Sequence, residues 1–314
     1  MPCSIDYDHG ITAIDSGLMR PLHDAVHLIV EGDRAAIVDT SSNDSLPHVL
    51  AALAARGLAP QQVDWVMLTH VHLDHAGGAG LLMSKFPNAR LTVHPRGARH
   101  MIDPSRLVAA TVAVYGAETA RRMYGEVLPV PADRVLETAE GACVSLNGRR
   151  FAFLDTPGHA RHHVCIVDER SGHVFTGDTF GLSYRQLDRD GRQTIFPATT
   201  PVQFDPPVLH ASIDRLLALA PAAMYLTHYG RLTDVQRCGA DLHRLVEAHA
   251  QLALDCRDAG AERRARLREG VAAIVLAEGR RQDWPMNERE LLAFFELDIG
   301  LNADGLAAWL DAGR

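Results

Sequence analysis

Apolar and polar residues alternate along the first part of the chain in a way that predicts a mixed α/β fold. Short apolar runs bounded by polar turns, typical of buried strands, lie at Ile11–Ile14, Ala25–Val30 and Ala35–Val38. Helical spacing follows, with apolar side chains at Leu46, Val49, Leu50 and Leu53. Ser45, directly before this run, is expected to cap the N-terminus of the helix.

The same alternation continues through the middle of the chain. A helix is expected near Ala79–Phe86, a strand at Arg90–His94, and helical structure with few breakers over Ser105–Tyr124. Further strands are expected at Val144–Leu146, Arg150–Leu154, Val164–Val167 and Val174–Thr176. Residues 97–126 are placed to pack over or beside a site at the strand ends. An ordinary surface helix pair is an equal alternative.

From Asp234 onward the strand pattern stops and the chain is expected to be helical to its end. Asp234 is expected to be an N-cap, and Asn287 with Glu290 matches a capping box ahead of a later helix. We therefore expect two parts: an α/β domain over residues 1–234 and a helical C-terminal extension over residues 235–314. The extension could cover the site, mediate dimerisation or only enlarge the core.

Composition is that of a globular protein and disfavours nucleic-acid and membrane partners. The 314 residues are 47% hydrophobic and 22% charged, enough to bury a large core. The formal net charge of −8 gives no overall basic character that would attract nucleic acid. No run approaches the roughly 18 apolar residues of a membrane span, and no signal-peptide pattern is found. The five cysteines form no Cys-x-x-Cys pair and are expected to be reduced, in a cytoplasmic protein.

One segment carries most of the candidate chemistry. Residues 69–78 read Thr-His-Val-His-Leu-Asp-His-Ala-Gly-Gly, which places four possible metal ligands within six residues: His70, His72, Asp74 and His75. The apolar run before them predicts a strand, and in extended chain residues two apart point the same way. The two glycines are expected to leave room for a metal. A lone histidine is usually structural, but this spacing favours zinc, or else iron or manganese.

Three later apolar runs also end on a histidine or aspartate. They lead into Asp155-Thr156-Pro157-Gly158-His159, Thr176-Gly177-Asp178 and Thr227-His228. Ligands delivered from several strand ends would lie along one edge of a sheet, where the sites of α/β proteins are found.

This set of motifs resembles the metallo-β-lactamase fold superfamily, over roughly residues 20–230. The resemblance rests on Thr69–Gly78, Pro157–His159, Thr176–Asp178 and Thr227–His228, and Ala36–Thr40 looks like the first motif of the family. It implies an α/β fold, a four-layered αβ/βα sandwich, here with a helical C-terminal extension. It also implies a dinuclear metal site, with glyoxalase II-like and uncharacterised metallohydrolases among the similar members.

Carried over by position, the resemblance implies that seven side chains hold two divalent ions, most simply Zn²⁺, with iron or manganese as alternatives. One ion would be held by His70, His72 and His159, and the other by Asp74, His75 and His228. Asp178 would bridge the two, and Asp39 would orient the ligand loop. His162 and His163 are expected to pack behind the ligands.

The resemblance implies a hydrolase that uses a metal-bound hydroxide on an ester, thioester or lactone, because two adjacent cations lower the pKa of a shared water. Asp74, besides binding metal, and Tyr184 are the candidate catalytic residues. Tyr184 could donate a hydrogen bond to a developing oxyanion, although loop packing is the simpler interpretation. The expected partner is a small carbonyl-containing or anionic substrate, and a homodimer is left open.

Two other classes of function stay open. Mononuclear iron sulfur (persulfide) dioxygenases keep the same motif residues and use a subset of them, such as His70, His159 and Asp178 here. A metal-containing sensor or ligand-binding protein with little turnover would also keep the ligand set. A true β-lactamase is disfavoured, because those sites usually lack the bridging aspartate that this chain has at Asp178.

Overall fold

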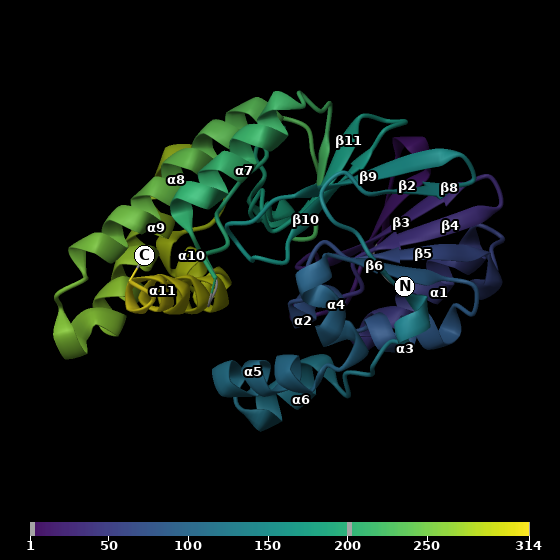
Figure 1. The fold of residues 1–314 in the computed structure, drawn as a ribbon. Helices are drawn as coiled ribbons and strands as arrows, with labels where there is room; N and C mark the ends of the chain where they lie inside the picture. The colour runs from purple at the N-terminus through teal and green to yellow at the C-terminus, as the bar shows by residue number, and fades with distance from the viewer. Residues whose placement is uncertain (1–3, 200–202, 314) are drawn as a thin grey trace. The chain divides into compact units, whose positions relative to one another are not determined.

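The computed structural model describes residues 4–199 and 203–313, and the first of its two β-sheets has seven strands in chain order (Figure 1). These strands are β1 (Ser4–Tyr7), β2 (Ile11–Asp15), β3 (Ala25–Glu31), β4 (Arg34–Val38), β5 (Val63–Met67), β6 (Arg90–Val93) and β7 (Val135–Glu137). Strands β1 to β4 are antiparallel, and β4 to β7 are parallel. The loops that follow β4 and β5 therefore leave the sheet at the same edge.

The second sheet has six strands in the order β13-β12-β11-β10-β9-β8. Their bounds are β8 (Cys143–Leu146), β9 (Arg149–Asp155), β10 (Val164–Asp168), β11 (His173–Gly177), β12 (Met224–Leu226) and β13 (Gly230–Leu232). Strands β8 to β11 pair antiparallel, whereas β11 and β12 are parallel. The motifs that contain Asp178 and His228 thus follow a parallel pair, as those after β4 and β5 do.

The chain divides into two compact units. The first comprises Met1–Asp155, His162–Gly177 and Ala223–Arg231, and contains strands β1 to β12. The second comprises Thr156–Arg161, Asp178–Ala222 and Leu232–Arg314. The expected boundary at residue 234 stays a prediction.

Strand β4 shows why the first unit is layered. It is buried on both faces: Ala35 and Ile37 belong to one apolar cluster, while Ala36 and Val38 belong to another. The first cluster packs this sheet against α1 (Leu46–Ala55), α3 (Ala79–Lys85) and α4 (Pro95–Ile102). The second cluster joins the two sheets face to face and includes Phe151 and Phe153 of β9.

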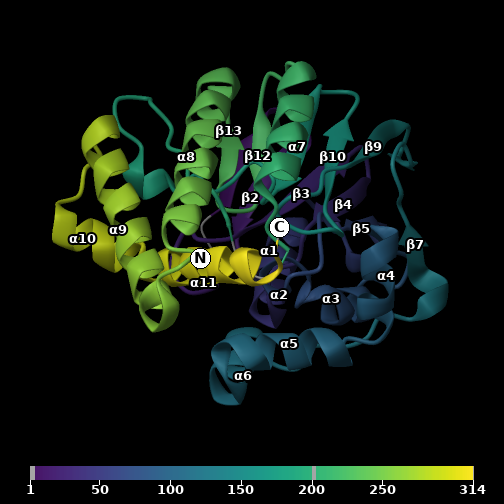
Figure 2. The same cartoon turned by 60° about the vertical axis from the view of Figure 1, so that its left-hand side comes forward.

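A helical hairpin lies in the first unit where helical structure is expected. Helix α5 (Ser105–Tyr115) and helix α6 (Ala117–Tyr124) are separated by Gly116, whose φ of +79° turns the chain. None of the residues of α5 is buried. The hairpin packs through Tyr124 and Leu107 against a small cluster that includes Leu73 of the metal loop. Both views place it next to α2 (Leu73–Ala76) (Figures 1 and 2).

The second unit is helical, as the C-terminal pattern predicts. Its helices are α7 (Pro206–Ala218), α8 (Val235–Asp255), α9 (Arg263–Gln282), α10 (Glu288–Phe294) and α11 (Glu296–Asp311) (Figure 2). Helix α8 packs on α7 and α9 through a buried face that includes Leu242, Leu245 and Val246. The capping box is confirmed, since Asn287 and Glu290 exchange hydrogen bonds of 2.9 and 3.0 Å.

Ser45 and Asp234 take the expected N-cap positions of α1 and α8, but neither side chain makes a capping hydrogen bond. The Ser45 hydroxyl instead donates to the Thr40 carbonyl at 2.6 Å, a contact that holds the loop after β4. The Asp234 carboxylate makes no cap bond and instead accepts a hydrogen bond from Arg237 at 2.5 Å. A nearby guanidinium is a stronger donor than a backbone amide.

Cysteines and hydropathy add two observations. Cys143, Cys165, Cys238 and Cys256 are free thiols, while Cys3 lies outside the residues described. Among the helices that the structure describes, none has both the length and the apolar character to cross a membrane.

One buried ion pair gives a direct test of the packing of the first unit. The guanidinium of Arg149 makes two hydrogen bonds, of 3.0 and 2.5 Å, to Asp168, and both side chains are at most 1% exposed. We expect Arg149→Met to lower the free energy of unfolding by about 3–5 kcal/mol, because it leaves a buried carboxylate unpaired. Urea unfolding measures the loss. Arg34→Met is the matched control, at a pair whose side chains are 29% and 27% exposed, and should cost about 1 kcal/mol or less. Equal losses would contradict the distinction.

The same pair has a pH signature. Burial alone would raise the pKa of Asp168, but hydrogen bonds from Arg149 and Ser171 and the guanidinium charge outweigh it and lower that pKa. The stabilisation is therefore complete above about pH 4, the ordinary carboxyl pKa, and is lost as pH falls through the lower folded-state pKa. We expect the difference in unfolding free energy between the wild type and Arg149→Met to shrink in acid. A constant difference from pH 7 to pH 2 would contradict this assignment.

Candidate metal centre

A buried carboxylate at the end of β4 organises the metal loop. Asp39 is 0% exposed and accepts hydrogen bonds from the Thr69 amide (2.8 Å), the Thr69 hydroxyl (2.9 Å), His75 Nδ1 (2.8 Å) and the Thr227 hydroxyl (2.8 Å). These donors come from three separate segments, which explains how Asp39 can keep a φ of +55° that is costly for a residue with a side chain. The expected orienting role of Asp39 agrees with this network.

The glycines after the ligands also meet a packing requirement that the sequence does not show. A Cβ at Gly78 would lie 2.7 Å from the carbonyl oxygen of Ser42, and Gly78 N donates to the Ser41 carbonyl at 2.7 Å. The backbone that follows β4 therefore packs directly on the metal loop. The glycines allow two loops to approach each other, which local spacing does not reveal.

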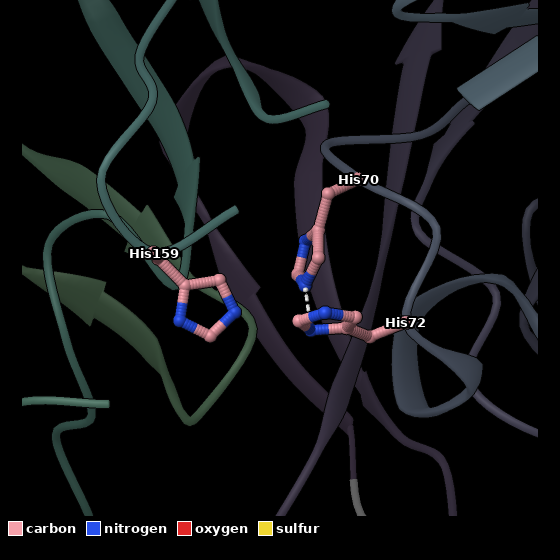
Figure 3. A group of neighbouring side chains, drawn as sticks. All are labelled: His70, His72 and His159. Carbon is pink, nitrogen blue, oxygen red and sulfur yellow. Dashed lines mark hydrogen bonds between the residues drawn. The ribbon is translucent and has the colours of Figure 1, made fainter. Parts of the chain in front are cut away.

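His70 and His72 converge as their spacing predicts. Their Nε2 and Nδ1 atoms lie 2.9 Å apart (Figure 3). The His70 ring is buried and stacks on His163, with centroids 4.8 Å apart. His163 also lies close to Gly177, where a Cβ would be 2.6 Å from its Nε2. These contacts are those of a residue that packs behind a ligand.

Asp74, His75 and His228 form a second convergence, and their hydrogen bonds determine which nitrogens carry lone pairs. His75 Nδ1 must donate to the Asp39 carboxylate, and His228 Nδ1 must donate to the His23 carbonyl at 2.9 Å. Each imidazole, if neutral, then has its lone pair on Nε2. Asp74 Oδ2 lies 3.7 Å from Nε2 of His75 and 3.5 Å from Nε2 of His228. Three electron-pair donors thus face one another, which is favourable only around a cation.

His159 and Asp178 form a pair within the second unit. His159 Nδ1 donates to the Ala198 carbonyl at 3.0 Å, which leaves the lone pair on Nε2. That nitrogen lies 3.5 Å from Asp178 Oδ2, and both side chains are buried. Gly158, with φ +126°, lets the loop pack on Leu209, because a Cβ there would lie 2.4 Å from its Cα.

Three groups of histidine and aspartate side chains could each hold a metal, because their ligand atoms lie within 4.8 Å of one another. Across residues 4–199 and 203–313 the groups are His70, His72 and His159; His70, His75 and Asp178; and Asp74, His75 and His228. They comprise the seven side chains that the sequence motifs predict. Imidazole nitrogen with carboxylate oxygen is the donor set of zinc, iron and manganese. These clusters indicate divalent metal binding.

Tyr184, the other candidate catalytic residue, is 2% exposed. Its hydroxyl donates to Asp298 at 2.9 Å, and its ring packs on Phe294 and Phe295, with centroids 5.4 and 5.9 Å away. These contacts tie the loop after Asp178 to the C-terminal helices. Its catalytic role stays a prediction.

Sequence reasoning missed Asp24. This residue is 0% exposed and directly precedes β3. The backbone amide of Ala25, the first residue of β3, donates to the Thr227 carbonyl at 2.8 Å. Asp24 therefore lies beside His228. The available signal was a charged residue at the start of a strand that is otherwise buried.

Comparisons with known proteins agree with the site. A sequence model of the metallo-beta-lactamase superfamily matches residues 20–228. The metallo-beta-lactamase fold-containing protein ST1585 of Sulfurisphaera tokodaii is 26% identical over 224 residues, 67% of this chain and 79% of that protein. The hydroxyacylglutathione hydrolase of Stenotrophomonas maltophilia is 31% identical over 163 residues, 52% of this chain but only 48% of that enzyme.

Solved structures show the same fold. The archaeal metallo-beta-lactamase superfamily protein ST1585 from Sulfolobus tokodaii superposes with a TM-score of 0.64 at 21% identity, covering 96% of this chain and 99% of that one. A metallo-beta-lactamase family protein from Thermus thermophilus gives a TM-score of 0.64 at 22% identity, covering 97% and 94%. The expected fold class, with its helical C-terminal extension, is confirmed. The chain belongs to the metallo-beta-lactamase superfamily.

Proposed function

We propose that the chain is a metal-dependent hydrolase with a two-metal site, acting on an ester, thioester or lactone. The observation that carries the proposal is the convergence of Asp74, His75 and His228. The Asp74 carboxylate oxygen lies close to the Nε2 atoms of His75 and His228. Each of these two rings carries its proton on the other nitrogen, Nδ1. The donor set fits a divalent ion, and the other two groups support a second ion nearby.

Hydrogen bonds within the protein orient three of these ligands. Asp39 fixes His75, the His23 carbonyl fixes His228, and the Ala198 carbonyl fixes His159. Such partners orient imidazole ligands and raise their basicity. A site preorganised in this way stabilises charge without reorganising during the reaction.

A pair of divalent ions, when bound, lowers the pKa of water and polarises a carbonyl oxygen. Asp74 is the ligand suited to proton handling, because its side chain is 30% exposed whereas His75 is fully buried. Its second oxygen can accept the proton that water loses and pass it to the leaving group. The two carboxylates among the seven ligands offset only half the charge of two divalent ions. A small anionic or carbonyl-containing substrate is therefore favoured.

Relatives support a hydrolase. Several are named hydroxyacylglutathione hydrolases, at about 30% identity. The matches span about half the length of those enzymes, so their substrate is not carried over to this chain. The ester, thioester or lactone class rests on the chemistry of the site.

Removal of a single ligand tests the metal assignment. We expect His72→Ala and Asp178→Asn each to lose metal and to lower kcat/KM more than about 100-fold, since even an orienting partner is worth 10–100-fold. Metal analysis and turnover of a thioester measure this, with circular dichroism to show that the fold persists. His100→Ala, a histidine outside the three groups, is the matched control. Full turnover by a folded, metal-poor His72→Ala would contradict the assignment.

The native metal content separates this proposal from its alternatives. We expect protein from unsupplemented cells to hold two equivalents of divalent metal and to turn over in a hydrolysis screen of thioesters, lactones and phosphodiesters. One iron, with oxygen consumed in the presence of a persulfide, would replace the proposal by a sulfur dioxygenase. Two metals without turnover on any substrate would favour a sensor.

A further inference from the structure

We infer that Asp24 is a positioning residue for the metal held by Asp74, His75 and His228: its buried carboxylate supplies a negative charge that raises the affinity of this group for a cation. The inference rests on the metal binding in the proposed function, and assigns to Asp24 a role that the family motifs do not include.

Backbone hydrogen bonds on both sides of Asp24 hold it against the segment that carries His228. The carbonyl before it, of His23, accepts from His228 Nδ1 at 2.9 Å, and the amide after it, of Ala25, donates to the Thr227 carbonyl at 2.8 Å. The His23 and His228 rings also meet edge to face, with centroids 5.2 Å apart. Asp24 is thereby fixed next to a ligand, without being a member of the ligand groups.

The contrast with Asp39 shows what Asp24 lacks. Both carboxylates are 0% exposed, but Asp39 accepts four hydrogen bonds. Neither oxygen of Asp24 has a partner in full hydrogen-bond geometry in the part of the chain that the structure describes. A buried carboxylate without such donors is costly unless a positive charge lies close to it.

The surroundings identify that charge. Burial raises the pKa of Asp24 to about 7, and the groups close enough to act on that pKa are His228, His75, the Ser41 hydroxyl and Asp74. Two of the residues that influence Asp24 are thus ligands whose lone pairs converge on one point. A divalent metal ion held by Asp74, His75 and His228 would supply the positive charge that Asp24 needs. Asp24 then adds a third negative charge to those of Asp74 and Asp178.

Asp24→Asn keeps the shape of the side chain and removes its charge, so it separates an electrostatic role from a packing role. The full-length protein is stripped of metal, and its Zn²⁺ affinity is measured by competition with a chromophoric chelator. We expect one of the two Zn²⁺ equivalents to bind about 10–100-fold more weakly, in the range of other residues that support ligands. Thermal unfolding of the metal-free variant should match or exceed that of the wild type, while the gain in Tm from Zn²⁺ shrinks.

Asp168→Asn is the matched control, because that buried carboxylate is fully paired and lies outside the ligand groups. It should lower Tm with and without Zn²⁺ and leave the Zn²⁺ affinity unchanged. Asp24→Ser is a second neutral variant, in case asparagine does not fit. Unchanged Zn²⁺ affinity in Asp24→Asn, or failure of both variants to fold, would overturn the inference and assign Asp24 to folding. A wild type that binds no Zn²⁺ would instead overturn the proposed function, so the two failures are distinguishable.

Discussion

The arrangement of the ligand segments in the first unit depends on the Asp39 carboxylate. Its hydrogen bonds join the end of β4, the loop after β5, helix α2 and the end of β12, segments up to 188 residues apart. Hydrogen bonds to a charged group contribute about 1.5–3 kcal/mol each. Loss of one would also leave a buried charge partly unsatisfied. The parallel pairs β4/β5 and β11/β12 bring the loops to sheet edges, and Asp39 sets how His75 points.

Backbone carbonyls complete this orientation. The His23 and Ala198 carbonyls each accept a proton from one ring nitrogen, of His228 and His159 respectively, as Asp39 does from His75. The opposite nitrogen of each ring is then available to an ion. Protonation of these rings would remove the lone pairs, so a metal and protons compete for the same atoms. The chemistry of the site follows from these contacts behind the ligands as much as from the ligands themselves.

The sequence was sufficient for the features that depend on local spacing. His70 and His72 converge because extended residues two apart share a face, and the sequence predicts β3 and β4 because most of their residues are apolar. Strands β1 and β7 were missed, since they are short edge strands that bury little. Helix α7 was missed although Asp205 caps it. Asp24 and the approach of the Ser42 carbonyl to Gly78 depend on distant segments, which no window of sequence contains.

Helix α5 shows where this architecture can tolerate change. It buries none of its residues, and Val114 is 48% exposed, so substitutions along it should cost little folding stability. The hairpin nevertheless packs on Leu73, between two predicted ligands. Selection can therefore vary this segment at small thermodynamic cost while β4, β5 and their loops stay constant. Divergence among relatives should concentrate in the hairpin, where altered side chains would change the surroundings of the metal loop without altering the ligands.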